Sequence, residues 1–277
     1  MKNIRTVLAL TLSVILCLGL FAGCGSSGTG SDTDVPDDIG SEDSDLAYIQ
    51  DKGVLVVGIT DFAPMDYKDE DGNWIGFDAD MASKVAEALG VEVEFVEIDW
   101  DNKIMELDAK SIDCVWNGMT LTDEVLKSMD CSNAYCNNAQ VVVVSADVAD
   151  EYQDMESLTE LSFAVEAGSA GEAAVKELGL SYTAVSTQAD SLLEVASGAS
   201  DACVIDLLMA GAMVGEGTSY ADLNYTVELT TEEYGVGCRK GSDLVAFINQ
   251  VFSELYADGT MMTVAEKYGV QEAIIAQ

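Results

Sequence analysis

Beyond residue 53, short runs of β-branched residues alternate with longer stretches whose apolar residues recur at helical spacing. Residues 54–59 and 202–206 are typical of buried strands, whereas residues 77–89 and 242–257 are typical of helices that bury one face. Asp78 is expected to cap the first of these helices. This alternation predicts an α/β protein, and 277 residues suit one large domain or two medium ones.

The charge balance excludes several classes of function. The chain has 50 acidic and 12 basic residues, a formal net charge of -38, and no histidine. Such a surface repels the phosphate backbone of nucleic acids. Without histidine, the chain lacks the commonest general base and the imidazole ligands of zinc. No glycine fingerprint for phosphates or dinucleotides follows a predicted strand, so we expect no nucleic acid partner, no metal and no cofactor.

The N-terminus is typical of a secretory signal peptide. Lys2 and Arg5 precede an apolar run that ends at Gly23, and its 17 residues are short for a membrane span. An uncleaved anchor is the alternative. The segment 20–24 (LFAGC) resembles the lipobox of bacterial lipoproteins, which implies removal of residues 1–23 and a lipid on Cys24 that anchors the mature chain outside the cytoplasm.

Residues 24–45 consist mostly of glycine, serine, threonine and acidic residues. Such a segment cannot bury enough apolar area to fold, and we expect it to form a disordered tether between the membrane and the folded part.

Five cysteines remain beyond the tether, and an odd number leaves at least one unpaired. Buried free thiols are the favoured interpretation, while a bridge between Cys131 and Cys136 remains open. The five are Cys114, Cys131, Cys136, Cys203 and Cys238.

Several stretches, in this order, resemble family 3 of the extracellular solute-binding proteins, the substrate-capturing components of polar amino acid ABC importers. The resemblance extends from about residue 53 to residue 269. It is carried by residues 58–65 (GITDFAPM), 76–80 (GFDAD), 113–122 (DCVWNGMTLT), 166–169 (EAGS), 201–206 (DACVID), 257–260 (ADGT) and 267–269 (KYG).

The resemblance implies a two-lobed fold of the type II periplasmic-binding-protein kind, with two hinge strands and the ligand in the cleft between the lobes. Residues 46–140 and 233–277 would form lobe 1, and residues 141–232 would form lobe 2. Open α/β sheets bind ligands at the carboxyl ends of their strands, and Asn117, Ser169 and Asp206 stand at such ends.

The family pattern also implies roles for individual residues. Aromatic side chains would stack on the ligand, the segment after residue 116 would hold its ammonium and carboxylate, the turn at Ser169 would offer amides to the carboxylate, and Asp206 would pair with the ammonium. Core packing remains the alternative for the aromatic residues, and helix capping for Ser169 and Asp206. The expected ligand-binding residues are Asp61, Phe62, Trp100, Trp116, Asn117, Gly118, Thr120, Ser169, Ala170 and Asp206.

One position departs from the family pattern. The family usually has a carboxylate-binding arginine where this chain has Val125. Arg239 is expected on a strand that leads away from the cleft, which makes it a poor replacement. The amides of residues 168–171 with Thr120 and Thr122 could hold a carboxylate instead, or the ligand could lack an ordinary carboxylate.

The resemblance therefore implies a monomeric, lipid-anchored binding protein that delivers an amino acid or a close derivative to an ABC permease and is not an enzyme. Two alternatives remain: a ligand-binding surface sensor without transport, and a dehydratase-like enzyme on the same fold.

Overall fold

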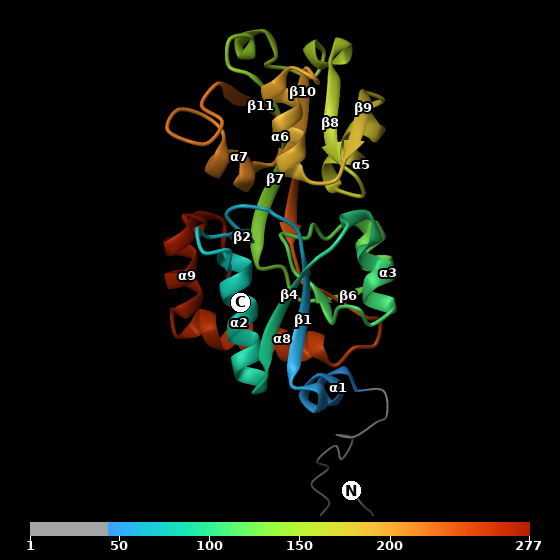
Figure 1. The fold of residues 1–277 in the computed structure, drawn as a ribbon, viewed down its shortest axis with the longest axis vertical. Helices are drawn as coiled ribbons and strands as arrows, with labels where there is room; N and C mark the ends of the chain where they lie inside the picture. Colours follow the sequence, from blue (N-terminus) through green and yellow to red (C-terminus); the bar gives the residue numbers. More distant parts are fainter. Residues whose placement is uncertain (1–43) are drawn as a thin grey trace, which may run out of the picture. The chain divides into compact units, whose positions relative to one another are not determined.

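The computed structural model describes residues 44–277. The predicted signal peptide, Cys24 and nearly all of the predicted tether lie outside the described residues. Two five-stranded sheets form the centres of two lobes (Figure 1). Within residues 44–277, no helix is both long enough and apolar enough to cross a membrane.

The first sheet has the strand order β4-β1-β5-β12-β6, in which β1 pairs in parallel with β4 and β5. Its strands are β1 (Val54–Ile59), β4 (Glu92–Glu97), β5 (Cys114–Val115), β6 (Asp130–Cys131) and β12 (Gly237–Cys238), beside the small hairpin of β2 (Tyr67–Lys68) and β3 (Trp74–Ile75). Its helices are α1 (Asp45–Lys52), α2 (Phe77–Leu89), α3 (Lys103–Asp108), α4 (Asp123–Ser128), α8 (Leu244–Ala257) and α9 (Thr260–Tyr268), with the short helices η1 (Trp100–Asn102) and η4 (Gln271–Ala273).

The second sheet has the order β11-β7-β10-β8-β9, in which β8 pairs in parallel with β9 and β10. Its strands are β7 (Cys136–Ser145), β8 (Ser162–Glu166), β9 (Ser181–Val185), β10 (Ala202–Asp206) and β11 (Leu223–Tyr234). Its helices are α5 (Ala170–Leu178), α6 (Gln188–Ser197) and α7 (Leu207–Met213), with the short helices η2 (Ala149–Glu151) and η3 (Ser157–Glu160).

The long strands β7 and β11 connect the two lobes. They pair antiparallel from Cys136 opposite Tyr234 to Ser145 opposite Leu223 (Figure 1). Polar residues 230–233 lie at the end of β11. This polar end lies where β11 passes between the lobes. The residue boundaries of the lobes, at 140/141 and 232/233, stay a prediction.

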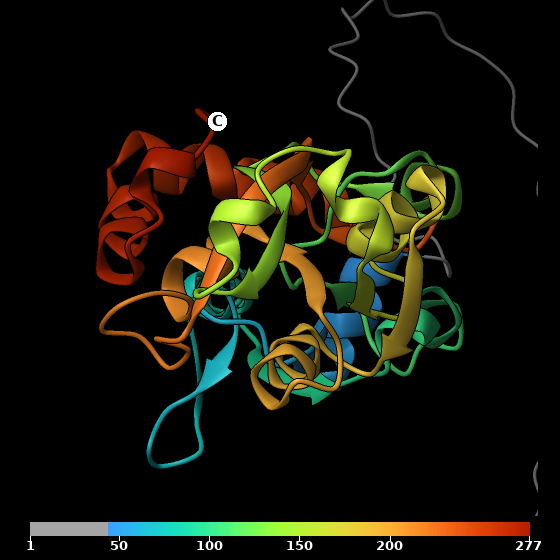
Figure 2. The same cartoon turned by 90° about the horizontal axis from the view of Figure 1, so that it is seen from above.

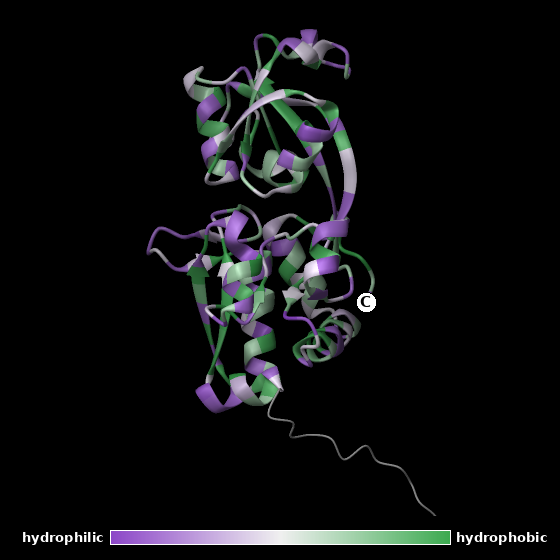
Figure 3. Cartoon of the chain, turned by 90° about the vertical axis from the view of Figure 1, so that its right-hand side faces the viewer, coloured by the Kyte–Doolittle hydropathy of each residue, from purple (hydrophilic) through white to green (hydrophobic). Residues whose placement is uncertain are grey.

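Burial explains why these strands form where they do. Residues 141–144 of β7 are all valine and nearly inaccessible to water, as expected for a strand covered on both faces. Hydrophobic residues dominate the central strands of both lobes (Figure 3). The C-terminal helices α8 and α9, drawn in red, pack on the first lobe together with α2 (Figures 1 and 2).

Asp78 does not cap α2, and that prediction is wrong. The N-cap is Gly76, which has a φ of 130° and lies so close to Met65 that an added Cβ would stand 2.0 Å from the Met65 carbonyl oxygen. Asp78 is fully buried within the first turn. Its carboxylate accepts hydrogen bonds from the Gly118 amide and the Tyr135 hydroxyl, both at 2.7 Å. Asp78 therefore ties the start of α2 to the segment that follows β5.

All five cysteines of the described part are free thiols, which confirms the favoured interpretation and leaves Cys131 and Cys136 unbridged. Burial raises the pKa of Cys131, the one of the five that is partly exposed, to about 11.

Arg239 lies in the base of the first lobe. It is 8% exposed, and its guanidinium contacts the Asp45 carboxylate at 2.9 Å and donates to the carbonyl oxygens of Leu107 and Ile112. Asp113 lies 3.6 Å away and also binds Lys52. Arg239 thus joins α1 to the end of α3, and it supplies no cation to a ligand.

We predict that replacing Arg239 with methionine destabilises the protein by about 3–5 kcal/mol, because the buried Asp45 loses its partner. Urea unfolding measures this change. Lys127→Met is the control, since Lys127 and its partner Asp123 are 77% and 96% exposed and their loss should change the stability by about 0.5 kcal/mol or less. Equal effects of the two substitutions would contradict the structural role of Arg239.

Candidate functional site

A cavity of about 410 Å³ lies between the two lobes. One wall comes from η1, the start of α3 and residues 119–125 of the first lobe, and the other from the N-terminal turn of α5 in the second. A neighbouring cavity of about 550 Å³ continues toward the polar end of β11 and shares Thr120, Thr122, Ala170 and Ala173 with it. Residues lining the first cavity include Trp100, Asp101, Lys103, Met119, Val125, Gly168, Ser169 and Glu172.

The carboxyl ends of parallel strands place these walls. β5 ends at Val115, just before the segment that reaches Thr122, and β8 ends at Glu166, just before the turn into α5. The segment is fixed to β11, because the amide of Leu121 donates to the Glu233 carbonyl and the amide of Gly235 donates to the Met119 carbonyl, both at 3.0 Å. The cavity therefore forms where an open α/β sheet is expected to bind its ligand.

Four of the ten expected residues meet at this cavity: Trp100, Thr120, Ser169 and Ala170. Ser169 caps α5, since its hydroxyl accepts the Glu172 amide hydrogen at 3.0 Å. The capping alternative is thus correct. Capping by Ser169 does not prevent the turn from binding a ligand, because the first amides of a helix have no carbonyl acceptor within the helix and stay available.

Asn117 and Gly118 lie behind the wall and hold it in place. The Asn117 side chain accepts from the Thr60 amide at 2.9 Å and donates to Asp66 at 2.8 Å, while the Gly118 amide donates to Asp78. Both residues therefore position the wall, and their polar groups are occupied by these protein partners.

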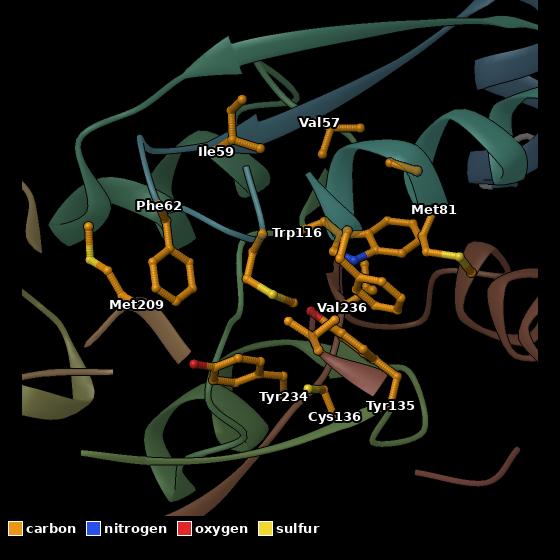
Figure 4. Packing of buried hydrophobic residues seen from close by; sticks show 14 of the residues in the cluster. Val57, Ile59, Phe62, Met81, Trp116, Tyr135, Cys136, Met209, Tyr234 and Val236 are labelled. Carbon is orange, nitrogen blue, oxygen red and sulfur yellow. The ribbon is translucent and has the colours of Figure 1, made fainter. Parts of the chain in front are cut away.

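The two other expected aromatic residues are buried. Phe62 is 2% exposed, lies edge-on to Tyr234 and is close to Met209 of the second lobe (Figure 4). Trp116 is 1% exposed and packs against Tyr135 and Phe252 in the core. The expectation that Trp116 lines the cleft is wrong, because its indole packs against Phe252 of α8 rather than facing the other lobe.

Asp206 is held by side chains from the connecting strands β7 and β11 and from α6. Its carboxylate accepts hydrogen bonds from Asn138, Gln140, Gln188 and Tyr234, and it makes no capping bond to α7. Burial, together with the neighbouring Glu232 carboxylate, raises the pKa of Asp206 well above its usual range. Asp206 lies beside the hinge strands and lines neither of the two cavities described above.

Asp61 is not brought to the main cavity. It is exposed and lines a separate cavity with Tyr67, Lys68, Ala212 and Met213.

The Val125 side chain is 5% exposed and packs in an apolar cluster with Trp100 and Met119, so it makes no polar contact with a ligand.

Sequence reasoning missed Lys103, which lines the cavity and is only 7% exposed. A lysine at a helix start is ordinarily solvated, and the only available signal was its position three residues after the expected cleft residue Trp100.

Glu166 also lies near the cavity. It is 2% exposed, and its Oε1 atom has no hydrogen-bond partner within residues 44–277. Burial, with a smaller effect of Asp206, raises the pKa of Glu166 to about 8, so its carboxyl group is largely protonated at neutral pH.

We predict that Glu166→Gln makes the ligand-free protein more stable than the wild type at pH 8 but not at pH 4. In the unfolded chain Glu166 ionises near its ordinary pKa of about 4.3, whereas in the folded chain it keeps its proton up to about pH 8. The stability that the protonated group contributes is therefore lost as the pH rises between these values. Glutamine cannot ionise and escapes this loss.

Melting temperatures of both proteins from pH 4 to 9 follow this effect. The corresponding difference in the free energy of unfolding should reach on the order of a few kcal/mol at pH 8. The exposed Glu160→Gln is the control and should follow the wild type throughout. A constant offset between Glu166→Gln and the wild type would contradict the prediction.

Comparison with known proteins assigns the family. Residues 55–271 match the sequence model of bacterial extracellular solute-binding proteins, family 3. The chain belongs to this family. Membership supports a substrate-binding role and a location outside the cytoplasm.

Two relatives illustrate the similarity. The L-cystine-binding protein TcyJ of Escherichia coli K12 is 28% identical over 80% of this chain and 85% of its own length. The arginine-binding extracellular protein ArtP of Bacillus subtilis strain 168 is 29% identical over 94% of this chain and 96% of its own.

Solved structures of family members confirm the two-lobed type II periplasmic-binding-protein fold. A mutant of the arginine-binding protein ArgBP from T. maritima has a TM-score of 0.76 and 34% identity, covering 81% of this chain and 99% of its own. A substrate-binding protein of an ABC uptake transporter from Streptococcus pneumoniae, solved with bound histidine, has a TM-score of 0.76 and 30% identity, with coverages of 84% and 99%. An ancestral amino acid-binding protein, described as a precursor of cyclohexadienyl dehydratase, has a TM-score of 0.74 and 34% identity, with coverages of 81% and 99%.

Proposed function

We propose that this protein is the substrate-binding component of an ABC importer, which captures an amino acid or a close derivative between its lobes and delivers it to a permease. The observation that carries the proposal is the cavity of about 410 Å³ lined from both lobes at the ends of parallel strands. Its volume suits an amino acid, and its lining combines a tryptophan ring with amides and hydroxyls.

The charges around this cavity suit a zwitterion. Lys103 and the N-terminal amides of α5 favour a carboxylate. The acids Asp101, Asp123 and Glu124, which line the same cavity, favour an ammonium group. Relatives of this chain are named as binding cystine, arginine or histidine, and we propose a polar or cationic amino acid for this chain too.

The contact between Gly168 and Asp101 supports capture by closure of the lobes. A Cβ added at Gly168 would lie 2.9 Å from the Asp101 Cα atom, so the turn before α5 approaches η1 without room for a side chain. Glycine permits this approach, and its φ of 71° also favours glycine. Hinge closure around a ligand is a common motion of two-lobed binding proteins.

Calorimetric titration and melting curves with L-arginine, L-histidine, L-glutamine and L-cystine test the proposal. At least one of them should bind without being consumed and should raise the melting temperature, since a ligand at 100 times its dissociation constant adds about 2.7 kcal/mol of stability. Mass spectrometry of the recovered compound distinguishes binding from turnover by a dehydratase-like enzyme. Binding without loss of uptake in cells that lack the gene would favour the surface sensor.

We also propose that a lipid on Cys24 anchors the protein to the cell membrane. This proposal rests on the sequence of residues 20–24. In cells, Cys24→Ala should move the protein from the membrane fraction to the medium, as measured by immunoblotting, whereas Cys131→Ala should not. Retention of the Cys24→Ala protein in the membrane would instead indicate an uncleaved anchor.

A further inference from the structure

Lys103 spans the space between the lobes. It begins α3, and its ammonium group donates to the carbonyl oxygen of Trp100 at 3.1 Å and, across the cleft, to that of Gly168 at 2.9 Å. It also lies 4.9 Å from the centre of the Trp100 ring. Two of its three N–H groups are thus directed at carbonyl oxygens, which leaves one donor.

This ammonium group forms no ion pair. Burial lowers its pKa, and the nearby carboxylates of Glu166, Glu124, Asp101 and Glu172 oppose that effect only in part. Across residues 44–277, no carboxylate lies within ion-pair distance of Lys103, although the side chain is 7% exposed. The other lysine that lines the cavity, Lys176, is paired with Glu172 at 2.9 Å and is 54% exposed. Burying a charge without a partner is costly, and buried charges in proteins are ordinarily paired.

The position of Lys103 indicates which partner is missing. The lysine shares the cavity with Ser169 and Ala170 at the N-terminus of α5, where free amides and the helix dipole also favour an anion. The nearby acid Glu166 is largely protonated at neutral pH, so it balances the lysine charge only in part. The remaining donor of Lys103 and the free amides of α5 therefore favour an anion that enters the cavity.

We propose that Lys103 binds the carboxylate of the captured amino acid and thereby selects ligands that carry a free carboxylate. This inference rests on the proposed function and names the residue that recognises the acidic end of the substrate. When the carboxylate is bound, the lysine links it to both lobes, because Trp100 and Gly168 belong to different lobes.

The test compares free acids with their methyl esters. The probes are L-arginine, L-histidine, L-glutamine and L-cystine, each with its methyl ester, titrated by calorimetry into the wild type, Lys103→Met, Lys103→Gln and Lys127→Met. The glutamine variant keeps an N–H donor for the two carbonyl oxygens but carries no charge. The Lys127→Met control removes a lysine that is 77% exposed and does not line the cavity. Melting curves without ligand establish that each variant is folded.

For the amino acid that the wild type binds, both Lys103 variants should weaken binding of the free acid by at least about 10-fold, because a charge-assisted hydrogen bond is lost. They should change binding of the ester by no more than about 2-fold, since the ester carries no anion to lose. Lys127→Met should leave both affinities unchanged.

Two results would overturn the inference and leave the proposed function intact. The first is that the Lys103 variants bind the free acid as tightly as the wild type does. The second is that they lose equal affinity for the acid and the ester, which would mean that Lys103 only holds the two lobes together. If no amino acid binds the wild type, the proposed function itself fails, and this inference fails with it.

Discussion

The antiparallel pair of β7 and β11 is the element on which the rest of the molecule depends. It crosses from one sheet to the other. The cavity wall at Met119 and Leu121 is hydrogen-bonded to Glu233 and Gly235, at the C-terminal end of β11. Asn138 and Gln140 on β7 each donate to both Asp206 and Glu232, and Tyr234 on β11 also donates to Asp206. A change in the angle between the lobes must therefore disturb this polar network, which couples the hinge to the end of β10.

Buried carboxyl groups without cations recur around this hinge. Asp66 and Asp78 are both fully inaccessible, and burial raises the pKa of Asp78 to about 7 and that of Asp66 well above its usual range, the latter with a contribution from Asp78. In a chain with 12 basic and 50 acidic residues, protons and polar side chains must take the place of counter-ions in the interior. Asp78 shows the structural benefit, because its carboxyl group fixes the Gly118 amide behind the cavity wall.

The sequence predicted the α/β alternation, the family, and the part of the site that follows directly from strand ends. Ser169 could be placed because a strand, a glycine and a capping serine in succession specify a turn into a helix. Trp116 could not be placed, because periodicity in a two-residue strand does not determine which face is buried. Asp78 was misassigned, because its hydrogen-bond partners Gly118 and Tyr135 are distant in sequence and no local pattern reveals them.

The location of Lys103 also explains how a chain with a net charge of -38 can offer a site to an anionic group. Surface charges in water are screened over roughly 8 Å at physiological salt, so distant acids contribute little to the potential inside the cleft. Within the cavity, the low exposure of Lys103 strengthens its interaction with any bound charge, and the amides at the start of α5 add to it. Glu172, one of the four acids that line the cavity, is partly neutralised by Lys176 and by the Gly168 amide. Local geometry, rather than net charge, therefore determines what this cleft can bind.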